Sequence, residues 1–296
     1  MKRVTIRVPA TTANLGPGFD AFGCALSLYT EVTFEETESG LEITGCDEEY
    51  AGPDNIAYTA YCAVLASLSE EVRGVKIHIE SQIPICRGLG SSAALLVAGA
   101  IGANVLRGNR LSTQGLLNIT NAMEGHPDNL APALYGGLTA SMVDRGLPVT
   151  VNFPLHPAWE IFALVPDFEL PTHVARAALP TDYDREDAVY NIAHGALVLK
   201  ALELGDEKLL HKAMQDRIHQ PYRKKMIPDY EAIESYVRTT GAAFCLSGAG
   251  PTLLCITRDA GLKEKLEKRL PAITKANWEV LPLHVVFKGA EIIEQE

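Results

Sequence analysis

The stretch Pro84–Ala94, "PICRGLGSSAA", decides the fold because it joins two elements of opposite character. Before it, residues 75–81 ("VKIHIES") alternate apolar and polar side chains, which is typical of a half-buried strand. After it, residues 93–108 ("AALLVAGAIGANVLRG") are apolar on nearly every face, which predicts a helix inside a core. The stretch is therefore a glycine-rich loop that leaves a strand and enters a buried helix.

Such a loop either holds phosphate or simply bends the chain. The first turn of the following helix offers backbone N–H groups without helical partners and the positive end of the helix dipole. Small residues let a polyphosphate approach the main chain, and Ser91 and Ser92 add hydroxyl groups. The lysine of the common nucleotide-binding loop is missing, so the loop by itself favours neither interpretation.

Composition limits the class of protein. A chain of 296 residues with 47% hydrophobic and 21% charged residues is typical of a globular protein with a sizeable core. The net charge of −11 argues against a binder of nucleic acid or anionic membranes, since both need a positive field. No secretory signal or unbroken apolar run of about 20 residues is present, and the six cysteines form no CxxC pair. We therefore expect a cytoplasmic protein with free thiols.

Strands and helices alternate along the rest of the chain, which indicates an α+β fold. A helix over 55–68 is expected to be capped by Asp54, and a helix over 112–125 by Ser112. We place the boundary between the two halves near residue 155, giving domains 1–155 and 156–296. Strands are predicted at 3–9, 29–36, 136–153 (a hairpin), 159–166, 242–257 (two strands around "SGAGP") and 278–287, and further helices at 185–204, 206–216, 229–240 and 260–269.

Two more glycine-rich stretches, 9–23 ("PATTANLGPGFDAFG") and 246–252 ("LSGAGPT"), favour the phosphate-binding interpretation of the loop. In this order, the three stretches resemble the motifs of the GHMP kinase superfamily, named for galacto-, homoserine, mevalonate and phosphomevalonate kinases. Within it, "EGHPDN" (124–129), "PTHVARAALP" (171–180) and "QPYRKKMIP" (220–228) resemble the homoserine kinase family. The resemblance covers essentially the whole chain. It implies a two-lobed fold, with a ribosomal-protein-S5-like N-terminal lobe and a ferredoxin-like C-terminal lobe.

The resemblance also implies a reaction: ATP- and Mg²⁺-dependent phosphorylation of the side-chain hydroxyl of L-homoserine, in threonine biosynthesis. Another small-alcohol kinase of the superfamily, acting on mevalonate, shikimate or a sugar, is the alternative. A catalytically silent relative that binds nucleotide is a second. The sequence leaves open the oligomeric state (a homodimer is one option), the kinetic constants, feedback by threonine and the motion of a lid.

The resemblance assigns the loop to ATP. A carboxylate near a triphosphate must either hold Mg²⁺ or repel the ligand, and the resemblance makes Glu124 a magnesium ligand assisted by Ser92. "SGAGPT" is expected to fold back against the loop and support it. The predicted nucleotide-binding residues are Pro84, Ile85, Cys86, Arg87, Gly88, Leu89, Gly90, Ser91, Ser92, Ala93, Ala94 and, beside the adenine or ribose, Asn55.

Five residues are implied for the amino-acid pocket: Asn14, Asp20, His126, Arg176 and Arg223. A zwitterion needs a cation for its carboxylate and an anion for its ammonium group, and this set supplies both. Asp20 is the candidate partner of the ammonium group or of the hydroxyl group. Arg176 is preferred over Arg223 for the carboxylate, because "YRKK" is also compatible with an exposed basic helix start.

The predicted catalytic residues are Asn129, Asp20 and Glu124. Several superfamily kinases are thought to use an aspartate as base near the acceptor hydroxyl, and Asn129 stands at the corresponding position. An amide cannot take a proton at neutral pH. We therefore expect catalysis by alignment and charge stabilisation without a dedicated base, with Asp20 as the alternative base.

Overall fold

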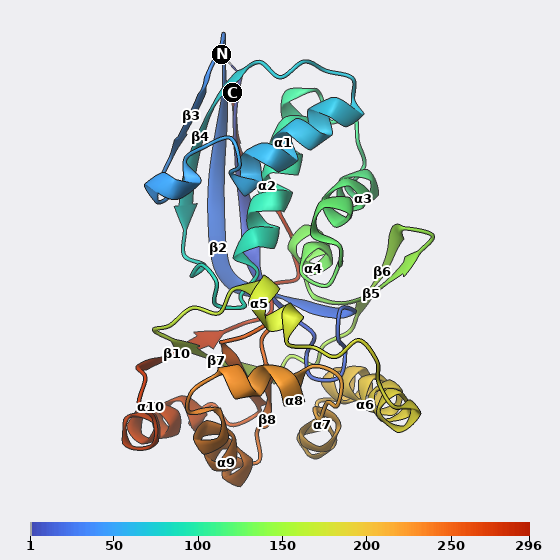
Figure 1. The fold of residues 1–296 in the computed structure, drawn as a ribbon, viewed down its shortest axis with the longest axis vertical. Coiled ribbons are helices and arrows are strands. Elements are labelled where there is room, and N and C mark those ends of the chain that lie inside the picture. Colours follow the sequence, from blue (N-terminus) through green and yellow to red (C-terminus); the bar gives the residue numbers. More distant parts are fainter. Residues whose placement is uncertain (1) are drawn as a thin grey trace.

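The computed structural model describes residues 2–296, which form two lobes (Figure 1). Each lobe contains its own sheet with helices packed against it, so the predicted two-lobed α+β fold is confirmed. The helix α5 (Thr172–Ala177) lies at the junction of the lobes in Figure 1, and the long strand β2 (Phe22–Thr37) runs down to it. The junction is where the functional residues gather.

The first lobe is built on a seven-stranded sheet in which β2 is central. The path β11-β1-β2-β4-β3 is extended by the hairpin β5–β6, because β5 also pairs with β2. The strands of this sheet are β1 (Arg3–Ala13), β2, β3 (Leu41–Thr44), β4 (Gly74–Ser81), β5 (Leu138–Asp144), β6 (Leu147–Phe153) and β11 (Glu291–Gln295). The helices of the lobe are α1 (Ile56–Ser67), α2 (Ser91–Leu106), α3 (Thr113–Glu124) and α4 (Leu130–Tyr135), with a short 3₁₀ turn at Glu48–Tyr50.

The core of the first lobe lies between its sheet and α2. Val4, Ile6 and Val8 alternate along β1 and are fully buried, as their period-two pattern predicts. The helix α2 is buried on nearly every face and contacts β1, β2 and α1, which confirms the expectation from its apolar sequence. This packing fixes the N-terminus of α2, and with it the glycine-rich loop, at the junction of the lobes.

The second lobe contains a four-stranded antiparallel sheet in the order β10-β7-β9-β8. The strands are β7 (Glu160–Pro166), β8 (Ala243–Leu246), β9 (Leu253–Thr257) and β10 (Trp278–Leu283). The helices are α5, α6 (Arg185–Leu204), α7 (Glu207–Ala213), α8 (Gln220–Arg223), α9 (Tyr230–Thr240) and α10 (Leu262–Ile273), with a 3₁₀ turn at Lys224–Met226 after α8. A second apolar cluster, distinct from that of the first lobe, includes buried side chains of β8, β9 and α9.

The last strand does not stay with the second sheet. Residues 291–295 (β11) return to the first lobe and pair antiparallel with β1, so the two ends of the chain lie close together in Figure 1. The expected domain 156–296 therefore contains the whole second sheet, but its last strand completes the first one. The free edge of β1 provides the backbone groups that this short strand needs.

Two helices begin at residues that differ from those predicted from the sequence. The cap of α1 is Asn55, not Asp54, because the Asn55 side chain accepts hydrogen bonds from the N–H groups of Ala57 and Tyr58. The helix α2 begins at Ser91, so both serines of the loop lie in its first turn. Ser112 caps α3 as predicted. Among the helices of residues 2–296, none is both long and apolar enough to cross a membrane.

Candidate active site

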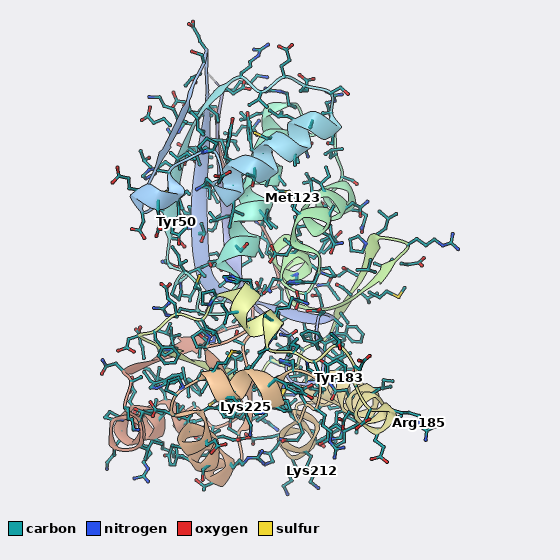
Figure 2. The ribbon with its side chains drawn as sticks, viewed as in Figure 1. Tyr50, Met123, Tyr183, Arg185, Lys212 and Lys225 are labelled. Carbon is teal, nitrogen blue, oxygen red and sulfur yellow. The ribbon has the colours of Figure 1, made fainter. Side chains whose placement is uncertain are left out.

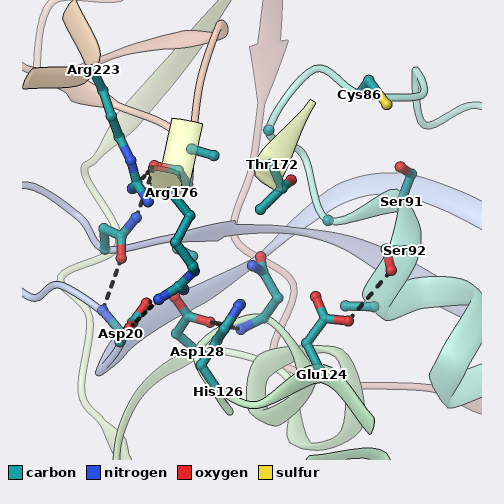
Figure 3. A pocket seen from close by; sticks show the side chains of 18 residues that line it. Asp20, Cys86, Ser91, Ser92, Glu124, His126, Asp128, Thr172, Arg176 and Arg223 are labelled. Atoms are coloured by element: carbon teal, nitrogen blue, oxygen red, sulfur yellow. Dashed lines mark hydrogen bonds and ion pairs between the residues drawn. The ribbon is translucent and has the colours of Figure 1, made fainter. Parts of the chain in front are cut away.

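A cleft lies between the lobes. The glycine-rich loop and the start of α2 form one end, and α5 and α8 of the second lobe close the other (Figure 3). Most of the predicted site residues line it: Asn14, Asp20, Cys86, Gly88, Gly90, Ser91, Ser92, Ala93, Glu124, His126, Asn129, Arg176 and Arg223. Five further lining residues were not predicted as ligand contacts, namely Ala13, Asp128, Thr172, Gly248 and Ala249.

The loop presents its main chain to the cleft. Gly88 and Gly90 have φ values of +77° and +72°, in the left-handed region that favours glycine. A Cβ atom on Gly88 would lie 2.3 Å from the Ser247 carbonyl oxygen, and one on Gly90 would lie 2.0 Å from the Thr11 hydroxyl oxygen. No side chain caps α2, so the N–H groups of its first turn stay available. The arrangement fits an anion at the helix N-terminus.

The second lobe holds this loop from behind. The Ser247 hydroxyl donates to the Gly88 carbonyl over 2.6 Å, and the Thr252 N–H donates to the Arg87 carbonyl over 3.2 Å. "SGAGPT" thus folds against the loop as expected, although Gly248 and Ala249 also reach the cleft. The Arg87 guanidinium donates to the carbonyls of Pro166 and Asp167, which points it at the second lobe. Any contribution of Arg87 to nucleotide binding stays a prediction.

The remaining loop residues divide between the core and a second cleft. Leu89 and Ala94 are fully buried, so their side chains serve packing. Pro84 lies outside both clefts. A second, apolar cleft lies beside the first one. It is lined by Ile85, Cys86, Ser91 and Ser92 together with Tyr50, Ile56, Ile79, Ile83 and Leu95. This cleft has the chemistry that a nucleoside needs next to a phosphate site.

Asn55 lies at the edge of the apolar cleft, but both ends of its amide are engaged. Its oxygen caps α1, and its nitrogen donates to the Tyr50 carbonyl over 2.9 Å. Asn55 therefore shapes the wall of the cleft by holding Tyr50 against the start of α1. A direct contact between Asn55 and a nucleotide stays a prediction.

Glu124 and Ser92 meet at the phosphate end of the cleft. The Ser92 hydroxyl lies 3.4 Å from Glu124 Oε2 (Figure 3). Burial raises the pKa of Glu124, and the neighbouring Asp128 raises it further against the opposing effect of His126. Glu124 forms no ion pair with a lysine or arginine among the described residues. A half-buried carboxylate beside a hydroxyl and a phosphate site fits Mg²⁺, which prefers oxygen ligands.

His126 and Asp128 form a second polar pair, with Nδ1 of the histidine 2.6 Å from Asp128 Oδ1. Burial alone would lower the pKa of His126, but the hydrogen bond to Asp128 and the charges of Asp20 and Glu124 outweigh it and raise that pKa. Asp128 also accepts the Asn129 N–H over 3.0 Å. Asp20, His126 and Asp128 place their ligand atoms within 4.8 Å of one another, so two carboxylates meet the imidazole at this end of the cleft.

Asn129 is held by the strand beside it. The Thr11 hydroxyl, buried on β1, donates to Asn129 Oδ1 over 2.8 Å. The Asn129 amide nitrogen is then left as the polar atom available to the cleft, and a primary amide nitrogen is a donor. Asn129 thus offers hydrogen-bond donation and no proton acceptor.

Asp20 and Arg176 face each other across the junction. Two hydrogen bonds of 2.8 and 2.9 Å join the guanidinium of Arg176 on α5 to both oxygens of Asp20 (Figure 3). The loop that carries Asp20 is held by Asn14, whose oxygen accepts the Asp20 N–H and whose nitrogen donates to the Gly248 carbonyl. The resemblance placed these three residues in one pocket, and the structure brings them together.

Arg223 is the most buried cation of the cleft, with 1% of its surface exposed. The sequence "YRKK" was also compatible with an exposed basic helix start, but this interpretation fits Lys225 and not Arg223. Lys225 is exposed to solvent (Figure 2), whereas Arg223 on α8 lines the cleft. Burial and the charge of Arg176 lower the pKa of Arg223 to about 10. Within residues 2–296, its hydrogen-bond partners are uncharged: the carbonyls of Ala175 and Gly248 and the ring of His219.

Family models match both halves of the chain. The GHMP kinases N terminal domain matches residues 55–137, and the GHMP kinases C terminal domain matches residues 198–275. The first match contains the glycine-rich loop, Glu124 and Asn129, and the second contains Arg223 and "SGAGPT". Fold and cleft together define the class of the protein as a GHMP-type kinase, a phosphotransferase.

Comparison with individual relatives identifies the family of kinases within this class. A homoserine kinase of Synechococcus sp. is 46% identical over 262 residues, which is 86% of this chain and 86% of the relative. A homoserine kinase of Clostridium beijerinckii is 39% identical over 98% of this chain and 99% of the relative. The crystal structure of homoserine kinase from Cytophaga hutchinsonii superposes with a TM-score of 0.88 at 28% identity, covering 98% of this chain and 97% of that chain. The chain therefore belongs to the homoserine kinase family.

Proposed function

We propose that this kinase transfers the γ-phosphoryl group of ATP to the side-chain hydroxyl of L-homoserine, giving O-phospho-L-homoserine for threonine biosynthesis. The observation that carries the proposal is Arg223, a buried cation without a carboxylate partner among the described residues, which lines the cleft opposite the phosphate loop. An unpaired buried charge is costly, and an incoming carboxylate would compensate it.

The charges of the cleft match a zwitterion. In the free protein, Asp20 and Arg176 neutralise each other. The ammonium group of an amino acid can take the place of Arg176 beside Asp20, while its carboxylate takes Arg176 and Arg223. Asp20 is then paired with the ammonium group of the ligand, and the two arginines share its carboxylate. Mevalonate and shikimate carry a carboxylate but no ammonium group, so a ligand of this kind that binds Arg176 would leave Asp20 unpaired. Galactose is uncharged and would leave Arg223 without a carboxylate partner.

The other end of the cleft supports ATP. The uncapped N–H groups at the start of α2 suit the phosphates, and the apolar cleft beside Tyr50 suits the nucleoside. Glu124 and Ser92 would hold Mg²⁺, which when bound offsets the negative charge that builds up on the transferring phosphoryl group. Glu124 thus serves as metal ligand rather than as a proton acceptor.

The geometry favours transfer without a dedicated base. Asn129 offers an N–H donor, and the carboxylate oxygens of Asp20 are occupied by Arg176 in the free protein and by the ammonium group in the proposed complex. The chain's residues would therefore align the hydroxyl with the phosphorus atom, and the helix N–H groups would stabilise the charge. An Asp20→Asn variant that binds homoserine normally but does not turn over would overturn this mechanism.

The test is ADP release from Mg²⁺-ATP with L-homoserine, D-homoserine, L-serine, mevalonate, shikimate and galactose. The proposal expects turnover of L-homoserine well above that of the other five compounds. Turnover of a different alcohol would keep the phosphate site and reject the substrate. A folded protein that binds ATP but phosphorylates none of them would favour a silent nucleotide-binding relative.

A further inference from the structure

His219 lies directly behind the substrate end of the cleft and is fully buried. It stands at the N-cap position of α8, one turn before Arg223. Its Nδ1 atom is 3.3 Å from Arg223 Nη1, and its Nε2 atom is 2.8 Å from the Gly16 carbonyl oxygen. One imidazole therefore joins the buried arginine to the loop that carries Asn14 and Asp20.

The two partners of the ring fix its protonation pattern. A peptide carbonyl only accepts hydrogen bonds, so Nε2 carries the proton. A guanidinium only donates, so Nδ1 is the bare acceptor. Both contacts are satisfied by the neutral imidazole with its proton on Nε2, and rotating the ring would break both. Burial lowers the pKa of His219 and Arg223 lowers it further, which outweighs Asp216 and keeps the ring neutral.

Asp216 anchors the segment on which His219 stands. Its fully buried carboxylate accepts the backbone N–H groups of residues 218, 219 and 220 over 2.7–3.0 Å. It also accepts the Asn191 amide of α6, whose nitrogen lies 3.2 Å from the Pro17 carbonyl as well. The turn before α8 is thus fixed to α6 and to the same substrate loop that His219 contacts.

The ring of Phe19 completes the support. His219 stacks on it with a centroid distance of 5.3 Å and an interplanar angle of 23°. The guanidinium carbon of Arg223 lies 5.2 Å from the same centroid. The plane of the guanidinium is therefore restrained by an aromatic face, and its direction by His219 and the Gly248 carbonyl.

We propose that His219 is a positioning residue for substrate binding: its Nδ1 atom orients the Arg223 guanidinium toward the substrate carboxylate, and its Nε2 atom locks Arg223 at a fixed distance from the Asp20 loop. This inference rests on the proposed function, because it requires a ligand with a carboxylate. It assigns to His219 no contact with substrate.

Two substitutions separate the two contacts. An asparagine side chain places its oxygen near the position of Nδ1, so His219→Asn keeps an acceptor for Arg223 and loses the donor to Gly16. A glutamine side chain places its nitrogen near the position of Nε2, so His219→Gln keeps the donor to Gly16 and loses the acceptor for Arg223. His284→Gln, at an exposed site, is the control for a histidine-to-amide change.

The measurements are KM for L-homoserine, KM for ATP, kcat and the melting temperature of each variant. We expect His219→Gln to raise the KM for homoserine on the order of tenfold to a hundredfold, the loss expected for a misplaced charged hydrogen bond. The KM for ATP should stay within about twofold, and His219→Asn should recover most of the loss in homoserine KM. The melting temperatures show whether the variants fold.

Each contrary outcome has a distinct meaning. If folded His219→Asn and His219→Gln raise the homoserine KM equally, or if the KM for ATP rises in parallel, His219 is a structural residue and the inference is wrong. If neither variant is folded, the test is made with Arg223→Lys in a protein that keeps His219. An unchanged homoserine KM in this variant would show that Arg223 does not bind the carboxylate, and the proposed role of His219 would then be wrong as well. If the unmodified protein does not phosphorylate L-homoserine, the proposed function fails first.

Discussion

Arg176 and Asp20 form a bidentate ion pair that joins the second lobe to the first across the cleft, with distances of 2.8 and 2.9 Å. The side chains are 42% and 32% exposed, so water screens the attraction between them. An exposed pair of this kind contributes only about 0–1 kcal/mol. A ligand that carries both a carboxylate and an ammonium group can therefore open the pair at little cost and form stronger pairs in its place.

This relationship predicts the effect of Arg176→Lys. Lysine keeps the charge but lacks the planar fork that binds a carboxylate through two parallel hydrogen bonds. We expect the KM for L-homoserine to rise about tenfold or more, while the KM for ATP changes little. Steady-state kinetics measure both, with Arg185→Lys as control because Arg185 is exposed and points away from the cleft (Figure 2). Equal effects of the two substitutions would contradict the role of Arg176.

Gly90 and Gly108 allow a matched test of the phosphate loop. Their φ values are +72° and +81°, so alanine strains the backbone at each. A Cβ atom at Gly108 meets nothing within 4 Å, whereas one at Gly90 collides with the Thr11 hydroxyl at 2.0 Å. Gly108→Ala should lower the free energy of unfolding by about 1–2 kcal/mol and leave the KM for ATP unchanged.

Gly90→Ala should lower the free energy of unfolding further and also raise the KM for ATP, because Thr11 must move and the start of α2 with it. Urea unfolding and ATP kinetics on the same preparations distinguish the two effects. A Gly90→Ala variant with normal ATP kinetics would show that the loop does not bind phosphate through its main chain.

Glu124→Gln removes the proposed magnesium ligand while keeping its shape and its contact with Ser92. We expect kcat to fall about a hundredfold or more, the order of magnitude of losing one charge-stabilising group in an active site. The Mg²⁺ concentration required for half-maximal rate should rise as well. Glu71→Gln, at an exposed position without an ion pair among the described residues, is the control. An unchanged Mg²⁺ requirement would remove Glu124 from the metal site.

Local patterns were sufficient for the features that depend on neighbouring residues. The strand, the glycine loop and the apolar helix at residues 75–106 follow from periodicity and from conformations that glycine adopts readily. The cap of α1 was misplaced by one residue, since Asp54 and Asn55 are both good caps and only the backbone geometry selects between them. The resemblance, not the periodicity, brought Asp20, His126 and Arg176 together.

Features that depend on distant contacts left no local signal, although the resemblance had placed Arg223 in the amino-acid pocket. Arg223 begins a basic run, and no local signal indicates that its first member is buried while Lys225 is exposed. Residues 291–295 ("EIIEQ") have the composition of a charged tail and become a strand because the edge of β1 is free. His219 and Asp216 acquire partners up to 203 residues away, so their roles emerge from the tertiary structure.

The raised pKa of His126 predicts how stability depends on pH. A histidine whose folded pKa lies above its ordinary value of 6.5 stabilises the fold fully below that pH, and the contribution is lost as pH rises through the folded pKa. Glu124 has the same sign of effect at lower pH, because burial raises its pKa above the ordinary 4.5. The effect of His126 is therefore measured by comparing the free energies of unfolding of two variants, Glu124→Gln and Glu124→Gln/His126→Asn. Glu124 is absent from both, so its titration does not contribute to the difference.

We expect the free energy of unfolding of the single variant to exceed that of the double variant most below pH 6.5, and the difference to shrink as pH rises above it. Urea unfolding at a series of pH values measures this difference directly. A difference that is independent of pH would mean that His126 has the same pKa in the folded and unfolded chains. The effect of burial would then cancel that of Asp128 and Asp20, and the prediction that these carboxylates outweigh burial at His126 would be wrong.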